Sequence, residues 1–131
     1  VSSRLKEALD EKVWLKSGAY LIIQPTEALT VIDVNSGKIQ KKHPGDDIYF
    51  TINKEAAKEI AFQLKLRNIS GIIVVDFINQ NKQEQDKELL HYFSSLVKED
   101  PVQTNVVGMT SLGLVEVTRK KVYRSLREQL I

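Results

Sequence analysis

Two aspartates stand at matching places in the sequence, each close to the end of a run of aliphatic residues. Asp33 follows Leu-Thr-Val-Ile and Asp76 follows Ile-Ile-Val-Val, so both are predicted at the carboxyl ends of buried strands. A buried carboxylate is costly unless it is paired, hydrogen-bonded or bound to a cation, and open α/β sheets bind ligands at this end of their strands. If the two strands are neighbours, the carboxylates converge, and a hard divalent cation would relieve their repulsion. The pair therefore predicts a magnesium site; the alternative is that each Asp only caps a turn.

Other side chains carry less specific signals. Asn35 lies two residues after the first of these aspartates, so its amide could orient a carboxylate or a phosphate oxygen, or could simply serve a turn. Trp14 and Tyr20 could stack on bases, although packing is the commoner role of such aromatics. His43 and His91 have no second His or Cys at ligand spacing, which argues against a zinc site. The sequence contains no phosphate-binding glycine loop and no nucleophile elbow.

The composition is that of a single soluble globular domain. The chain has 131 residues, of which 42% are hydrophobic and 27% are charged, and domains are most often about 100–150 residues long. There is no apolar run of 18 residues, which argues against a transmembrane helix. The absence of cysteine excludes a disulfide framework and a thiol nucleophile within these residues, and it fits a reducing compartment.

The small net charge of +2 is unevenly distributed along the chain. The last fourteen residues carry five basic side chains and one acidic side chain, whereas the other 117 residues carry a net charge of −2. A basic terminal segment on a slightly acidic body indicates contact with a polyanion. The alternative is a solvated helix face.

The spacing of apolar residues predicts helices interleaved with buried strands. Helices are expected within residues 1–12, from Asn53 as N-cap to about residue 67, over residues 82–98 and in the last fourteen residues. Strands are expected over residues 19–24, 28–34, 72–77, 104–108 and 113–117. The continuous apolar strand 72–77 is typical of a sheet that is covered on both faces. We therefore expect one domain of the α/β class, with a mixed β-sheet flanked by helices.

Three long strings of residues carry a family resemblance: SGAYLIIQPTEALTVIDVNSGK, AAKEIAFQLKLRNISGIIVVDFI and LGLVEVTRKK. They are similar, in this order and along nearly the whole chain, to the catalytic core of the ribonuclease E/G family. The separation of Asp33 and Asp76 by 43 positions fits that family's spacing. The resemblance implies that residues 1–131 form a single deoxyribonuclease-I-like catalytic subdomain of a longer parent protein, with residues 1–12 a helix carried over from the preceding subdomain.

The resemblance also implies roles for particular residues. Asp33 and Asp76 would hold Mg²⁺ and Asn35 would help to orient them, so that all three would be catalytic. The implied reaction is magnesium-dependent hydrolysis of phosphodiester bonds in single-stranded RNA, as part of RNA processing or decay in the cytoplasm. The parent protein would be a homo-oligomer with further subdomains, and any zinc site would lie beyond this chain. Phosphate contacts are expected from Arg119, Lys120 and Lys121.

Three residues depart from the family pattern. Asn79 stands in place of the second acid of a D-F-I-D motif, Ser111 in place of a basic residue, and Gln103 in place of an arginine that contributes to sensing of the RNA 5′ end. These departures leave dependence on the 5′ end open. Two other classes of protein are alternatives. A non-catalytic RNA-binding α/β module needs no ion at the aspartates, and a receiver-like phospho-acceptor domain expects an acidic pair near the first strand, which this sequence lacks.

Overall fold

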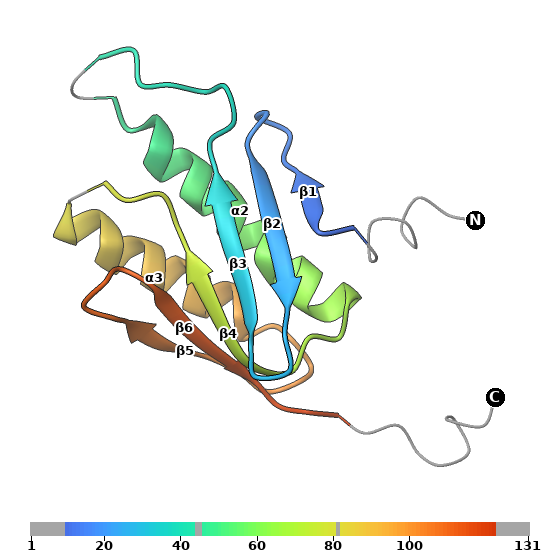
Figure 1. The fold of residues 1–131 in the computed structure, drawn as a ribbon. Helices are drawn as coiled ribbons and strands as arrows, with labels where there is room; N and C mark the ends of the chain where they lie inside the picture. Colours follow the sequence, from blue (N-terminus) through green and yellow to red (C-terminus); the bar gives the residue numbers. More distant parts are fainter. Residues whose placement is uncertain (1–9, 44–45, 81, 123–131) are drawn as a thin grey trace.

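The computed structural model describes residues 10–43, 46–80 and 82–122 of the chain. These residues form six strands and two helices (Figure 1). In chain order the elements are β1 (Lys12–Trp14), β2 (Tyr20–Pro25), β3 (Thr30–Asn35), α2 (Ile48–Leu66), β4 (Gly71–Asp76), α3 (Gln83–Val97), β5 (Thr104–Met109) and β6 (Val115–Arg119). Neither described helix is apolar enough over sufficient length to cross a membrane.

All six strands belong to one mixed sheet, in the order β1-β2-β3-β4-β6-β5. The central pair β3 and β4 is parallel, and every other neighbouring pair is antiparallel. Helix α2 makes the connection between β3 and β4 that a parallel pair requires. The carboxyl ends of β3 and β4 therefore meet at the same edge of the sheet. This architecture confirms the predicted α/β fold with a mixed sheet flanked by helices.

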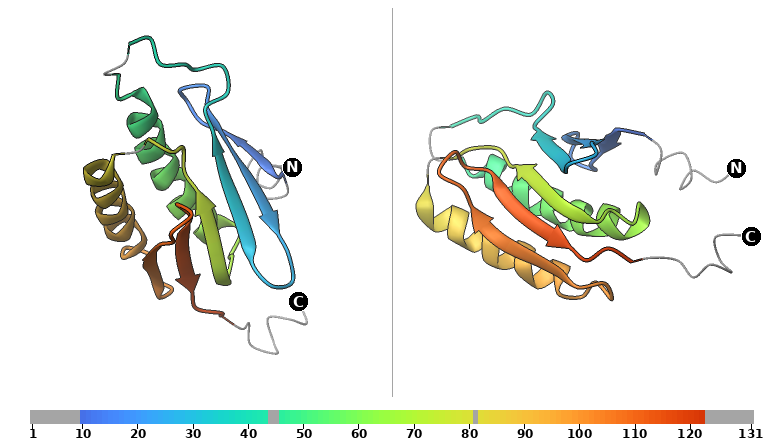
Figure 2. Two further views of the ribbon diagram at one scale, coloured as in Figure 1. Left: turned by 60° about the vertical axis from the view of Figure 1, so that its left-hand side comes forward. Right: turned by 60° about the horizontal axis from the view of Figure 1, so that its bottom comes forward.

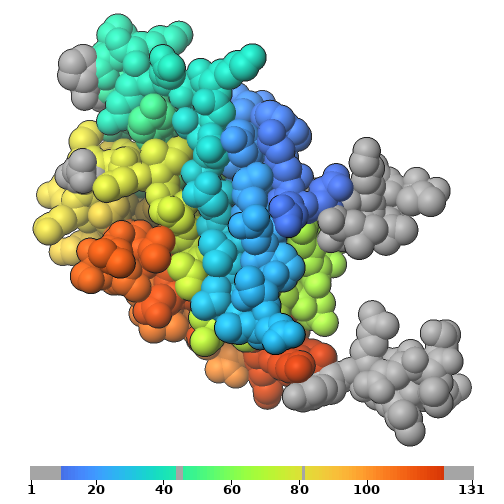
Figure 3. Space-filling view, viewed as in Figure 1, coloured from blue at the N-terminus to red at the C-terminus, as the bar shows by residue number. Residues whose placement is uncertain are grey.

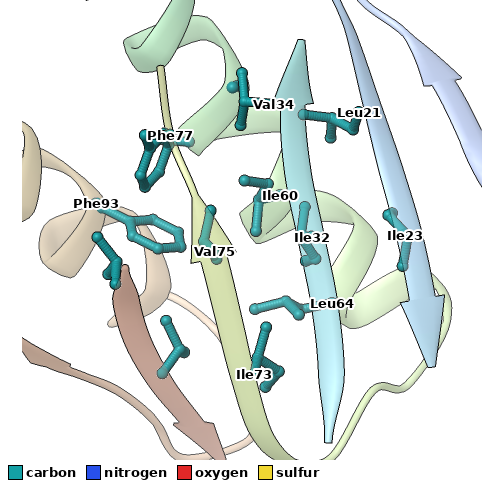
Figure 4. Packing of buried hydrophobic residues seen from close by; sticks show 14 of the residues in the cluster. Leu21, Ile23, Ile32, Val34, Ile60, Leu64, Ile73, Val75, Phe77 and Phe93 are labelled. Atoms are coloured by element: carbon teal, nitrogen blue, oxygen red, sulfur yellow. The ribbon is translucent and has the colours of Figure 1, made fainter. Parts of the chain in front are cut away.

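The molecule has two layers, a sheet and a pair of helices. Helices α2 and α3 pack against each other on the same side of the sheet (Figures 1 and 2). The core lies between the layers, where Ile32 of β3 and Val75 of β4 meet Ile60 and Leu64 of α2 (Figure 4). Along β3 the alternate residues Thr30, Ile32 and Val34 are buried, while the residues between them are only half-buried. The opposite side of the sheet, called the open face below, carries no helix among the described residues (Figure 3).

The one-sided cover corrects the prediction that strand 72–77 is covered on both faces. Ile73 and Val75 are fully buried on the helix side, but Ile72 is 49% exposed. The apolar run misleads because two of the outward-facing residues of β4, Ile72 and Val74, are also aliphatic. These residues lie on the open face, where they are partly accessible to solvent.

The start of α2 also differs from the prediction. The helix begins at Ile48, five residues before Asn53, and the Asn53 side chain is buried within it. Its Nδ2 donates to the carbonyl of Ile78 at 2.8 Å, and the Ile78 N–H donates to its Oδ1 at 2.9 Å. Asn53 is therefore not an N-cap. It holds the backbone of the loop that follows Asp76, which a capping motif alone could not reveal.

The ends of the described chain modify two further predictions. Residues 10–12 are not helical: residues 10 and 11 have no regular structure, and Lys12 begins the short edge strand β1, which is not among the predicted strands. The rest of the predicted first helix lies outside the described residues. The predicted helix in the last fourteen residues is wrong at its start, because Thr118 and Arg119 belong to β6 and residues 120–122 have no regular structure. Its remaining residues, 123–131, lie outside the described residues. The other predicted strands and the predicted helix 82–98 are found within two residues of their expected bounds.

Candidate metal centre and nucleic-acid face

Asp33 and Asp76 face each other across the central parallel pair of strands. Their Cα atoms are direct register partners, so their strands are neighbours, which was the condition for the two carboxylates to converge. Neighbouring strands are about 4.8 Å apart, and register partners project to the same face. Because Ile32 and Val75 point into the core, both aspartates project to the open face, at its carboxyl-terminal edge.

The two carboxylates lie close together, and no positively charged side chain among the described residues pairs with either of them. Burial raises the pKa of the Asp33 carboxyl above its ordinary value, and the neighbouring charge of Asp76 raises this pKa further. Neither carboxylate has a hydrogen bond or ion pair with another side chain among the described residues. No group of three or more His, Cys, Asp or Glu side chains suitable for a metal is found there either. Two carboxylates without a protein cation fit Mg²⁺, which takes one or two carboxylates and retains waters for a phosphate ligand.

Asn35 lies on the open face, at the end of β3. Its Oδ1 accepts a hydrogen bond from the Gly37 N–H at 2.8 Å, so this oxygen serves the turn, one of the two roles that the sequence left open. Gly37 has a φ of +64°, and a Cβ there would lie 2.7 Å from the carbonyl oxygen of Gly18. The turn that fixes Asn35 therefore needs glycine, both for its left-handed backbone and for this close approach.

A small cavity of about 150 Å³ adjoins Asp76. Asn79, Asp86 of the first turn of α3 and the exposed Leu112 contribute to its lining. Asn79, at the position where the family pattern has an acid, thus shares this cavity with Asp76. Sequence reasoning missed Asp86 because nothing in a helix's first turn indicates which loop it will face.

Arg119 has a structural place that differs from its predicted role. Its side chain is only 3% exposed, and its Nε donates to Asp100 at 2.8 Å. Its Nη1 donates to the Asn68 side chain and to the Ile69 carbonyl, both at 3.0 Å. The guanidinium is therefore buried and hydrogen-bonded within the protein, so Arg119 is not placed to contact RNA phosphate, contrary to the prediction.

Lys120 and Lys121 are exposed, but they lie far from the aspartate pair. Strand β6 runs antiparallel to β4, and Arg119 is the register partner of Gly71, at the start of β4. Gly71 and Asp76 are five positions apart along β4, which is about 17 Å at the usual rise of a strand. The two lysines therefore follow the opposite edge of the sheet from the candidate metal centre.

A cluster of Lys12, Trp14 and Tyr20 occupies the open face at the β1 edge. The ring centroids of Trp14 and Tyr20 are 5.2 Å apart, and Lys12 Nζ lies 4.2 Å from each of them. Trp14 is 62% exposed, so packing in the core, the commoner role weighed from sequence, does not apply to it. The lysine was missed because β1 was not predicted.

The chain is similar to known ribonucleases along nearly its whole length. It is 44% identical to Ribonuclease G of Escherichia coli (strain K12), over 130 residues that make up 99% of this chain and 27% of that protein. It is 45% identical to Ribonuclease E of Synechocystis sp. over 128 residues, 98% of this chain and 19% of that protein. Ribonuclease G of Haemophilus influenzae is 44% identical over 130 residues, 99% of this chain and 26% of that protein. The chain thus spans less than a third of the length of these relatives. Since residues 1–122 also match the Ribonuclease E/G family, the chain belongs to that family.

Proposed function

We propose that this chain is the catalytic subdomain of a magnesium-dependent endoribonuclease that hydrolyses phosphodiester bonds of single-stranded RNA. The observation that carries the proposal is the direct register of Asp33 and Asp76 at the carboxyl ends of two neighbouring parallel strands. Two relatives that align with nearly the whole chain are named Ribonuclease G and Ribonuclease E, which supports an RNA substrate.

The carboxylate pair would hold the ion and the open face would admit the substrate. Asp33 and Asp76 would bind Mg²⁺, which supplies Lewis-acid stabilisation of phosphoryl oxygens and activation of water. Neither aspartate needs to act as a nucleophile. Because the described helices cover only the other side of the sheet, an extended polynucleotide can approach the pair directly. The turn at Asn35 would keep that side chain beside the substrate path.

The proposal extends to the parent protein. Residues 1–131 would form one subdomain within a longer cytoplasmic protein, in contact with its other subdomains and assembled as a homo-oligomer. Lys120 and Lys121 would contact the RNA backbone away from the cleaved bond, since they follow the far edge of the sheet. Each phosphate that they neutralise would add a slope of about −0.7 to the dependence of log affinity on log salt.

The test is RNA cleavage by the full-length protein that carries this chain. Asp33→Asn and Asp76→Asn should each abolish magnesium-dependent cleavage of a single-stranded RNA and preserve the far-ultraviolet circular dichroism spectrum. The matched control is Glu88→Gln, which makes the same change of charge on the exposed side of α3. Cleavage by Asp76→Asn at the parental rate would refute the metal assignment. Binding of RNA without any cleavage, with or without Mg²⁺, would favour the binding-module alternative.

A further inference from the structure

The cluster of Lys12, Trp14 and Tyr20 is aligned with the candidate metal centre by the register of the sheet. Trp14 pairs with Tyr20, and Tyr20 pairs with Asn35, so one row of side chains crosses three strands. The adjacent row on the same face begins at Lys12 and ends at the two aspartates, because Lys12 pairs with Ile22 and Ile22 pairs with Asp33. Two strand spacings, about 10 Å, separate β1 from β3.

An open groove of about 640 Å³ joins the aromatic residues to the end of β3. Its lining includes Trp14, Tyr20, Gly18, Asn35 and Lys38. The groove thus brings Trp14 and Tyr20 together with Asn35, which lies two residues from Asp33. A groove of this size can hold one base and its sugar, since small-molecule pockets are about 300–1,000 Å³.

The chemistry of these residues is that of a platform for unpaired bases. Proteins that bind single-stranded nucleic acid stack bases on exposed aromatic rings and neutralise the backbone with nearby cations. Trp14 supplies an aromatic surface that is largely exposed, and two residues supply positive charge near it: Lys12 Nζ lies over its ring, and Lys38 lines the same groove. An exposed Trp within an apolar protein interface would not require two lysines around it, so the charge favours an anionic occupant.

We propose that Trp14 and Tyr20 form a base-stacking subsite for a nucleotide of single-stranded RNA that flanks the bond to be cleaved. The inference rests on the proposed function, because it assumes that RNA passes over Asp33 and Asp76. It adds a positioning site that fixes where the RNA lies relative to the carboxylate pair. Stacking tolerates any base, so the subsite would contribute affinity and alignment and not a strict sequence preference.

The chain offers a direct probe, because Trp14 is its single tryptophan. Titration of the 131-residue chain with a single-stranded ribonucleotide decamer, in EDTA and at low salt, should quench the tryptophan fluorescence saturably. Fluorescence anisotropy of a labelled decamer then gives the affinity of variants. Trp14→Ala should weaken binding by about 5- to 150-fold, the range of stacking on one aromatic residue, and Trp14→Phe should restore part of it. The matched control is Val107→Ala, at an apolar residue of the other edge strand that is 63% exposed and should bind like the wild type.

Three results would overturn the subsite. One is RNA binding without quenching and with equal affinity in Trp14→Ala; another is the absence of any binding by the wild-type chain. The third is a change of oligomeric state in Trp14→Ala, measured by sedimentation, with RNA affinity unchanged, which would make this face a protein interface. None of these results decides the proposed function, since that function is tested separately by the effect of the aspartate variants on cleavage.

Discussion

Replacement of Asp76 by Asn should stabilise the protein in the absence of metal, although it should destroy the site. In the folded chain the two carboxylates are register partners with no side-chain partner among the described residues. In the unfolded chain they are 43 residues apart, and salt screens charges beyond about 10 Å at 0.1 M ionic strength. Folding therefore creates a repulsion that the substitution removes.

The size of this repulsion follows from the geometry. Two unit charges about 5 Å apart repel by about 0.8 kcal/mol in bulk water and by about 3 kcal/mol at an effective dielectric constant of 20. Asp76 is exposed and Asp33 is half-buried, so solvent screening places the value near the lower limit. We expect Asp76→Asn to raise the free energy of unfolding at pH 7 by about 1 kcal/mol in EDTA. For a chain of this length, that is a rise in melting temperature of about 3–5 °C.

Magnesium should reverse this order of stability. A ligand at ten times its dissociation constant stabilises the folded state by about 1.4 kcal/mol. The wild type should gain this amount as Mg²⁺ is added, whereas Asp76→Asn should gain little, because one of its two carboxylates is absent. Urea unfolding with and without Mg²⁺, at constant ionic strength, measures both effects in one protein. Glu88→Gln, on the exposed side of α3, should leave both values unchanged.

The double variant Asp33→Asn with Asp76→Asn gives the sharpest test. Either single change already removes the repulsion, so the double variant should be no more stable in EDTA than the better single variant. If the two single gains add, or if Asp76→Asn is less stable than the wild type in EDTA, the carboxylates do not repel each other as argued. A wild type that Mg²⁺ does not stabilise would contradict the metal assignment itself.

Three further predictions concern contacts that hold the site in place. Asp100→Asn should lower the free energy of unfolding by about 3–5 kcal/mol in urea, because the buried Arg119 guanidinium loses its countercharge. Burial acts to raise the pKa of Asp100, but hydrogen bonds, first of all from Arg119, outweigh burial and hold this pKa below its ordinary value of 3.8. The contribution of the Asp100–Arg119 pair to stability should therefore be complete above that pH and be lost as the pH falls through the pKa of the folded state. Gly37→Ala should lower the stability to thermal unfolding by at least about 1–2 kcal/mol, since alanine resists a left-handed backbone and its Cβ would also crowd the Gly18 carbonyl. Asn53→Ala should cost about 1–3 kcal/mol and accelerate hydrogen exchange at the Ile78 amide, because both backbone groups of Ile78 lose their partner.

Each of these three has an outcome that contradicts it. For Asp100, the contradiction would be a stability profile between pH 2 and 6 that is the same in the variant and the wild type. For Gly37, it would be an alanine variant that melts at the wild-type temperature. For Asn53, the contradicting result would be a destabilised alanine variant in which the Ile78 amide exchanges at the wild-type rate. The loss of stability would then arise from packing alone.

Local patterns predicted the elements well, because they depend on residues that are close in sequence. Runs of β-branched residues gave the bounds of β3 and β4 to within two residues, and helical spacing of apolar residues gave α3 to within one residue at each end. Only those features of the site that depend on residues close in sequence could be predicted. The local pattern placed Asp33 and Asp76 at strand ends. It could not predict that the two strands are neighbours, because their pairing depends on the crossover through α2.

The predictions that were wrong concern polar side chains whose partners are distant in sequence. Arg119 lies in a basic segment that looks solvated, and its partner Asp100 is 19 residues away on the other side of the β5–β6 hairpin. Asn53 satisfies N-cap preferences, but its partner Ile78 is 25 residues away. In both cases burial makes the polar group depend on specific hydrogen-bonded partners, and no pattern within a single element indicates which residues those partners are.

The geometry of the aspartate pair follows from the apolar residues beside it. Side chains alternate between the two faces of a strand, so a shift of one residue in the pairing would exchange all inward and outward positions. Ile32 and Val75 are both fully buried against the helices and are register partners. Exposing either on the open face would cost about 1.5–3 kcal/mol, which fixes the register. Asp33 and Asp76, each the next residue along its strand, must then project together to the open face. The core therefore determines that the two carboxylates meet, despite their mutual repulsion.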